Sequence, residues 1–197
     1  KNLKSFYNSV ISMNPKNYSK KIATETVKTI ENLIEKNNPW EMLAYFNKDD
    51  MISTGAPFIW NLNPDDKDTK INRSYISAHA FELADINVYY DDGTEVSYKK
   101  KYREEYKKFI KNIFNTLIGK NDYNPQHVID VEVDIFDALG CVDVTKKEEE
   151  PYNKVYAEEA FLKYGFDWKE FSKQLGFKNT PKFFITSSLN YLKCGSE

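Results

Sequence analysis

The chain has 197 residues, of which 41% are hydrophobic and 15% aromatic, and its formal net charge is -2. It is long enough to bury a hydrophobic core, and the balanced charge argues against a nucleic-acid partner. None of its apolar runs is long enough to span a bilayer.

The first residue indicates whether the chain is a fragment, and the cysteines limit the number of disulfides. Because it begins at Lys1 without a methionine, we expect a piece of a longer protein. Two cysteines, Cys141 and Cys194, are too few for a disulfide framework and allow one bridge at most. Cys141 has no basic neighbour that would activate a thiolate, so we expect an inert thiol there.

Apolar residues at helical spacing predict three helices in the first quarter of the chain. The first runs through LKSFYNSVIS and is closed by Pro15, the second spans about 19–36 with Ser19 as its cap, and the third starts at Pro39. The residues expected to face inward are Leu3, Phe6, Tyr7, Val10, Ile11, Ala23, Val27, Ile30, Ile34, Trp40, Leu43 and Phe46.

A β-hairpin is expected within residues 57–80. The β-prone runs PFIWNL and RSYISAH are separated by the turn-rich segment NPDDKDTKIN. Alternating aspartates in this turn could bind calcium, but the turn lacks the glycine at the sixth position and the closing glutamate of an EF-hand loop. A solvated turn is therefore the favoured interpretation.

The clearest helical pattern spans about 97–118, and we expect this helix to be a central element. Its tyrosines alternate with lysines, as in some RNA-binding segments, but they keep helical spacing, so packing explains them better. Glu104 and Lys108 are spaced for an ion pair. A further helix is expected from Asn124 and Pro125 to Gly140. The inward residues would be Tyr102, Tyr106, Phe109, Ile113, Phe114, Leu117, Val128, Val131, Ile135 and Leu139.

Two short helices, around residues 157–164 and 168–175, are predicted in YNKVYAEEAFLKYGFDWKEFSKQLG, which begins at residue 152. Asp167 is placed to cap the second helix and Glu170 to return a hydrogen bond, as in a capping box. Phe171 and Leu175 share one face, and Gly176 is placed to end the helix in a left-handed conformation. The residues as a whole predict a mainly helical fold with one small β element.

No local motif predicts catalysis or metal binding. The two histidines, His79 and His127, belong to no HExxH pattern, and the chain has no G-x-S-x-G, P-loop or G-x-G-x-x-G sequence. We therefore expect no catalytic residue and no metal ligand in this segment, and the sequence identifies no substrate-binding residue.

The segment YNKVYAEEA…FDWKEF resembles part of the neprilysin and endothelin-converting-enzyme family of zinc metallopeptidases. There, a Tyr-Asn-Lys-Met-Thr-Leu run starts one helix and a Phe-Asp/Ser-Trp run starts the next. Tyr152, Asn153 and Lys154 match directly, and Phe166 and Trp168 fall at the expected distance.

Other segments resemble family motifs in the same order along nearly the whole chain. FYNSV is similar to a Tyr-x-Ser-Cys run, GAPFIWNLNPDDKD to a Gly…Phe…Asp-x-Lys-Asp segment, and VYYDDGTE to an Asp-Tyr-Tyr run before a long helix. VIDVEVDIFDAL is similar to a Phe-Glu-x-x-Leu-Ala helix with Glu132 at the glutamate, and FITSSLNYLK to a strand-like run followed by Tyr-Leu.

Three departures mark a divergent member. Val10 stands where the family has a cysteine of the lid disulfide, which favours a reducing compartment without identifying it. LADINV replaces Leu-Pro-x-Arg-Asp, so the usual salt-bridging arginine has no counterpart. Tyr156 occupies the position of a capping threonine and cannot cap.

The resemblance implies that residues 1–197 are part of one helical lid domain of a neprilysin-like metallopeptidase, mainly α with a small β-hairpin. The lid would enclose oligopeptides beside a catalytic zinc domain outside this segment, so zinc belongs to the parent protein and this segment alone is not catalytic. The structural anchors would be Trp168, Tyr152, Phe166 and Phe171. The alternative is a non-catalytic relative that serves as a structural or protein-binding module.

Overall fold

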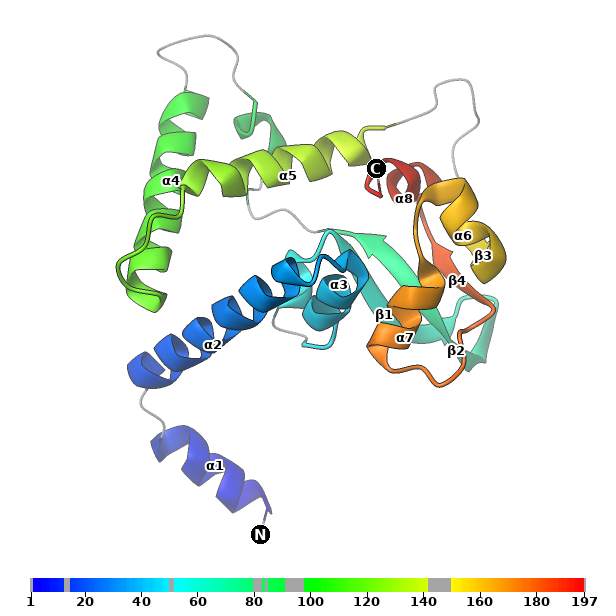
Figure 1. The fold of residues 1–197 in the computed structure, drawn as a ribbon, viewed down its shortest axis with the longest axis horizontal. Coiled ribbons are helices and arrows are strands. Elements are labelled where there is room, and N and C mark those ends of the chain that lie inside the picture. Colours follow the sequence, from blue (N-terminus) through cyan, green and yellow to red (C-terminus); the bar gives the residue numbers. More distant parts are fainter. Residues whose placement is uncertain are drawn as a thin grey trace.

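The computed structural model describes residues 2–12, 15–49, 52–79, 83, 85–90, 98–141 and 150–196, which form helices around a small sheet (Figure 1). In chain order the elements are α1 (Asn2–Ser12), α2 (Pro15–Glu35), α3 (Pro39–Asn47), η1 (Ser53–Gly55), β1 (Phe58–Asp65), β2 (Asp68–Ala78), η2 (Ile86–Val88), α4 (Tyr98–Leu117), α5 (Pro125–Leu139), β3 (Asn153–Tyr156), α6 (Ala157–Tyr164), α7 (Trp168–Leu175), β4 (Phe183–Thr186) and α8 (Leu189–Cys194). The mainly helical class is confirmed. None of the described helices is long and apolar enough to cross a membrane.

The sheet has the order β1-β2-β4-β3. The predicted hairpin is confirmed, since β1 pairs antiparallel with β2 from Phe58 opposite Ala78 to Asp65 opposite Asp68. β4 pairs parallel with β2 and antiparallel with β3. The two short helices expected around residues 157–164 and 168–175 are confirmed as α6 and α7. The residues just before α6 form β3, because their backbone pairs with β4, which lies about 30 residues further along the chain.

Most helix boundaries follow local signals. Asn38 and Asn124 accept hydrogen bonds from the first amides of α3 and α5, and Asp167 accepts one from Glu170 N in α7 at 3.0 Å. Gly176 ends α7 with φ +102, as expected. The carboxylate of Glu170 accepts hydrogen bonds from Gln174 and Lys173. Tyr156 provides no side-chain cap, as predicted.

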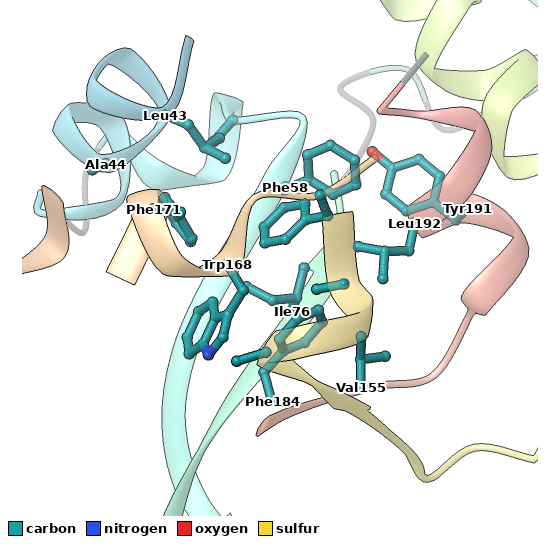
Figure 2. Close-up of a cluster of buried hydrophobic side chains, with 14 residues drawn as sticks. Leu43, Ala44, Phe58, Ile76, Val155, Trp168, Phe171, Phe184, Tyr191 and Leu192 are labelled. Carbon is teal, nitrogen blue, oxygen red and sulfur yellow. The ribbon is translucent and has the colours of Figure 1, made fainter. Parts of the chain in front are cut away.

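The main core lies between the sheet and α3, α6, α7 and α8, and aromatic rings dominate it (Figure 2). Trp168 is fully buried, its ring centroid lies 5.0 Å from that of Phe184, and its Nε1 donates to the carbonyl of Pro181 at 2.8 Å. Phe166 is also buried, and its centroid lies 5.2 Å from Phe58 and 5.6 Å from Phe171. These ring contacts join α7 and the turn before it to β1 and β4.

A second, smaller core lies under α4 and α5. Its buried members are Tyr89, Ile110 and Ile129. Arg103 of α4 donates to the carbonyls of Val88 and Tyr90, so an arginine from another element holds the segment that replaces the family's Leu-Pro-x-Arg-Asp.

Several expected inward faces are wrong. Phe109 is 58% exposed and Ile113 37% exposed, and α4 buries Ile110 instead. Val131 and Ile34 are also exposed. α4 lies at the edge of the molecule rather than at its centre (Figure 1), and three residues of its predicted apolar stripe, Tyr102, Phe109 and Ile113, are exposed. The spacing of apolar residues predicts which side chains share a helix face, but not which element packs against that face.

The N-terminal helices, and the ion pairs of α4, also differ from what the sequence predicted. α1 buries none of its residues and projects from the end of α2 (Figure 1), and Leu3 is 81% exposed. α2 begins at Pro15, so Ser19 lies inside the helix and does not cap it. In α4, Glu104 pairs with Lys107 and Glu105 with Lys108, in place of the expected pair of Glu104 with Lys108.

Cys141 and Cys194 form a disulfide that joins the end of α5 to the end of α8, with 6.4 Å between their Cα atoms. The inert thiol expected at Cys141 was therefore wrong. The inference to a reducing compartment was wrong too, because the chain carries a disulfide despite Val10, and disulfides persist in oxidising compartments. The bond connects residues far apart in the sequence, which only the fold brings together.

We expect Trp168→Ala to lower the free energy of unfolding by about 3–5 kcal/mol, because it removes a fully buried ring and leaves a cavity. Asp167→Ala removes only a helix cap and should cost about 0.5–2 kcal/mol. Denaturant unfolding measures both losses. A Trp168→Ala protein as stable as the parent would show that the indole is not part of the core.

Replacing both cysteines by serine should lower the free energy of unfolding by about 2–4 kcal/mol, because the bond restricts the unfolded chain across a separation of 53 residues. Thiol titration of the denatured, unreduced protein should find no free thiol. Two reactive thiols before reduction would contradict the bond.

Candidate functional site

A pocket of about 620 Å³ opens between α4 and α5 on one side and the start and end of the hairpin on the other. We call it the α4–α5 pocket. It is lined by Gly55, His79, Tyr106, Phe114, Asp122, Tyr123, Asn124, His127, Val128, Val131, Glu132 and Ile135. Its walls come from η1, the residue after β2, the two helices and the segment that joins them. These segments are separate in the sequence, and the tertiary fold brings them together.

Aromatic rings form one wall of this pocket. Phe114 and Tyr123 meet edge to face, with 5.6 Å between their ring centroids. The hydroxyl of Tyr123 donates to Glu31 Oε1 of α2 at 3.2 Å, so α2 supports the segment between α4 and α5. These contacts orient the ring of Tyr123 at the side of the pocket.

Two carboxylates give the pocket an acidic character. Glu132 is only 6% exposed, and its Oε1 accepts a hydrogen bond from the hydroxyl of Tyr106 at 3.1 Å. Asp122 lies on the exposed side of the pocket. No lysine or arginine is among the described lining residues. The ammonium of Lys111 lies nearby on α4 and donates to the carbonyl of Tyr123.

The structure brings together two histidines that the sequence treated as isolated. His79 follows β2 and His127 lies in the first turns of α5, yet both line the pocket. No group of three or more His, Cys, Asp or Glu side chains in the described ranges is placed to hold a metal ion. No local spacing could have found this pocket, because its residues come from separate elements.

A second polar cluster ties the tip of the hairpin to the start of β3. Asp65 is buried, and its carboxylate accepts hydrogen bonds from Arg73 Nε at 3.1 Å, the Tyr152 hydroxyl at 2.9 Å and the amide of Lys67 at 2.9 Å. The expected solvated turn was therefore wrong at Asp65. Arg73 also lies over the ring of Phe183, 4.9 Å from its centroid.

The hydrogen bonds of this cluster shift two pKa values in opposite directions. The amide of Lys67, together with Tyr152 and Arg73, holds the pKa of Asp65 below its usual range. Burial, and then the bond to Asp65, raises the pKa of Tyr152 to about 12. Both groups keep their ordinary charge at neutral pH, so we interpret the cluster as a structural lock and not as an acid–base pair.

The other expected anchors lie away from the α4–α5 pocket. Trp168, Phe166 and Phe171 are all fully buried in the main core, and none lines the pocket. They hold α7 and the preceding turn to the sheet and to α3, where the Trp40 and Phe166 centroids lie 5.0 Å apart. Their placement is that of core residues.

Comparison with known proteins gives a family and a fold. A family model described as peptidase family M13 matches residues 1–196. The zinc metalloprotease Zmp1 of Mycobacterium tuberculosis in complex with an inhibitor is similar to this chain, with a TM-score of 0.60 and 15% identity over 92% of the chain. The open state of Zmp1 is similar too, with a TM-score of 0.55 and 16% identity over 91% of the chain. A search of curated proteins found no match.

The chain spans less than a third of the length of these structures, 28% of the first and 29% of the second. The likeness at this level of identity concerns the fold. It extends over 92% of this chain and is therefore not confined to one pair of helices.

At neutral pH we expect Asp65→Asn to destabilise the fold, because the variant loses a carboxylate held by Arg73 and Tyr152. The folded-state pKa of Asp65 is depressed, so its contribution is complete above the ordinary aspartate pKa of about 3.9 and is lost as the pH falls through the lower folded value. The stability difference between parent and variant should therefore shrink below about pH 4.

Urea unfolding across this pH range measures the difference. Asp68→Asn is the matched control, since it removes the same charge from an exposed position at the same turn. A stability difference for Asp65→Asn that is independent of pH would contradict the depressed pKa.

Proposed function

This chain belongs to peptidase family M13, and from this membership we propose that residues 1–197 are part of one helical lid domain of a neprilysin-like zinc metalloendopeptidase. The match over residues 1–196 is the observation that carries the proposal. The shared fold with a zinc metalloprotease, over 92% of this chain but 28% of that one, supports it. The larger, unmatched share of such a protein leaves room for the catalytic domain.

Zinc belongs to this proposal as a group held outside the chain. Zinc sites use sets of three or four His, Cys, Asp or Glu ligands, and the described residues offer no such set. The residues present therefore do not fit the metal, and we place both the metal and the catalytic residues in the remainder of the protein. A catalytic zinc activates a water molecule and polarises a scissile carbonyl.

The proposed role of this chain is to enclose an oligopeptide and to exclude folded proteins. Exposed apolar surface supports such a role, because apolar patches on a soluble protein mark contact surfaces. Phe6 and Ile11 on α1, and Tyr102 and Phe109 on α4, are all more than half exposed. We propose that the remainder of the protein packs against these faces and that the α4–α5 pocket opens towards the enclosed space.

The test uses the longer protein that contains this chain. We expect it to bind zinc, to cleave a short peptide, and to spare the same peptide when it is inserted in a loop of a folded carrier protein. As a control, the same carrier is unfolded before it is incubated with the longer protein. Cleavage of the unfolded carrier shows that the inserted peptide is cleavable in that context.

Equal rates on the free peptide and the folded carrier would overturn the enclosing role. A longer protein that binds no zinc and cleaves neither substrate would favour the alternative, a non-catalytic relative that serves as a structural or protein-binding module.

A further inference from the structure

We propose that Asn72, near the closed end of the β1–β2 hairpin, carries an N-linked glycan. Asn72, Arg73 and Ser74 form an Asn-x-Ser run, which is the acceptor motif for this modification in secreted proteins. The inference goes beyond the proposed function and does not depend on it, because it concerns the end of the hairpin and not the pocket or a catalytic domain.

Asn72 lies on the surface, where a bulky glycan has room. Every residue from 66 to 72 is exposed, and Asn72 lies opposite Pro64, just before the register of the hairpin shifts. Within the described ranges, the side chain of Asn72 makes no hydrogen bond that a glycan would break. Asn47 and Asn153 differ, since their side-chain amides donate to backbone carbonyls of the fold. The amide nitrogen of Asn72 is therefore available as an acceptor of the glycan.

A glycan at this position leaves the Asp65 cluster intact. Successive side chains of a strand point to opposite faces, so Arg73, whose Nε lies 3.1 Å from the carboxylate of Asp65, is on the other face of the sheet from Asn72. Two large apolar side chains lie near the same end of the hairpin, namely Leu62, opposite Ser74, and Ile71, and both are exposed. A bulky, solubilising glycan shields such apolar groups from contact with other proteins.

The disulfide is an independent observation that points the same way. Disulfides form in the endoplasmic reticulum and persist in secreted proteins, and the bond between Cys141 and Cys194 places this chain in an oxidising compartment. N-linked glycans are added in the same lumen. A chain that acquires this bond during secretion therefore also meets the enzyme that recognises Asn-x-Ser.

The modification is a group transfer from a lipid-linked oligosaccharide. Nδ2 of Asn72 forms a bond to the first sugar carbon of a polyprenyl-diphosphate oligosaccharide. The bond from that carbon to the diphosphate oxygen breaks, the diphosphate leaves with the electron pair, and Nδ2 gives one proton to a base of the transferase. Ser74 is only 4% exposed in the fold, so the transfer takes place before the hairpin packs and covers this part of the motif.

The glycan also determines which way the hairpin faces in the longer protein. A bulky hydrophilic group at Asn72 needs solvent around it. The end of the hairpin, residues 66–72, is thus a solvent-facing surface, and no other part of the longer protein packs against it.

The test uses the longer protein, secreted from a eukaryotic cell, and the same protein isolated from the cells that naturally make it. A peptide N-glycanase removes N-linked glycans and converts the asparagine that carried them to aspartate. We expect digestion to increase the mobility of the denatured protein in a gel, and mass spectrometry to locate the conversion at Asn72. An undigested sample measures spontaneous deamidation.

Variants locate the site. Asn72→Gln keeps an amide but removes the acceptor motif, so the conversion and its share of the mobility shift should disappear. Ser74→Thr keeps the motif and should keep the glycan. Asn61→Gln is the matched control, because it changes an exposed asparagine of the same hairpin that belongs to no Asn-x-Ser run. Asn17→Gln removes the other such run of the sequence, residues 17–19, and separates its contribution.

An unmodified Asn72 in the digested protein from both sources, or a mobility shift that Asn72→Gln leaves unchanged, would overturn the proposal. Cell lysates are analysed beside the medium, so a variant that is retained in the cell is still scored. Zinc binding and cleavage are measured separately. A glycan at Asn72 on a protein without zinc leaves this inference standing and removes the peptidase role, whereas an active zinc peptidase with an unmodified Asn72 does the reverse.

Discussion

The contact between Trp168 and Phe184 is the one on which the rest of the sheet depends. A buried indole needs an acceptor for its N–H group, and Trp168 finds one in the carbonyl of Pro181, two residues before β4. This hydrogen bond and the 5.0 Å ring contact hold β4 under α7. β4 is the strand to which both β2 and β3 pair. The aromatic packing in Figure 2 therefore also decides where the hairpin and β3 lie.

Helices α4 and α5 are attached to this core by fewer interactions. Their own core buries three side chains, and each buried apolar side chain contributes only about 1.5–3 kcal/mol. α4 and α5 are connected to the remainder of the fold by the disulfide between Cys141 and Cys194, by the hydrogen bond from Tyr123 to Glu31, and by packing of Ile135, Ala138 and Leu139 against the main core. The α4–α5 pocket lies where α4 and α5 face the hairpin, so these links also maintain the pocket's shape.

Departures from the family pattern have physical replacements in this chain. Tyr156 does not cap α6 with its side chain, and the start of α6 is held by the amide of Ala157, which donates to the carbonyl of Lys182 just before β4. The segment without the family's arginine receives Arg103 from α4, which donates to the carbonyls of Val88 and Tyr90. In both segments a hydrogen bond from a residue distant in the sequence holds the backbone where the motif is altered. A divergent sequence can thus keep the fold.

The sequence by itself determined the elements whose causes are local. The helix start at Asn124 and Pro125 and the cap at Asp167 depend only on neighbouring residues, and Gly176 needs only its own left-handed backbone, so these were predicted correctly. The hairpin was predicted for the same reason, because its strands and its turn are adjacent in the chain. The order of the sequence motifs was enough to identify the family, because a motif is defined by its residues and not by their contacts in the fold.

Tertiary structure decided what depends on a partner distant in sequence. It made a strand of the residues before Ala157, because β4 pairs with them, and it left Phe109 exposed, because α4 lies at the edge of the described fold. It also joined Cys141 to Cys194 and brought His79 and Glu132 to one pocket. Periodicity shows which side chains share a face, but a face is buried only where another element packs against it, and that is a property of the whole fold.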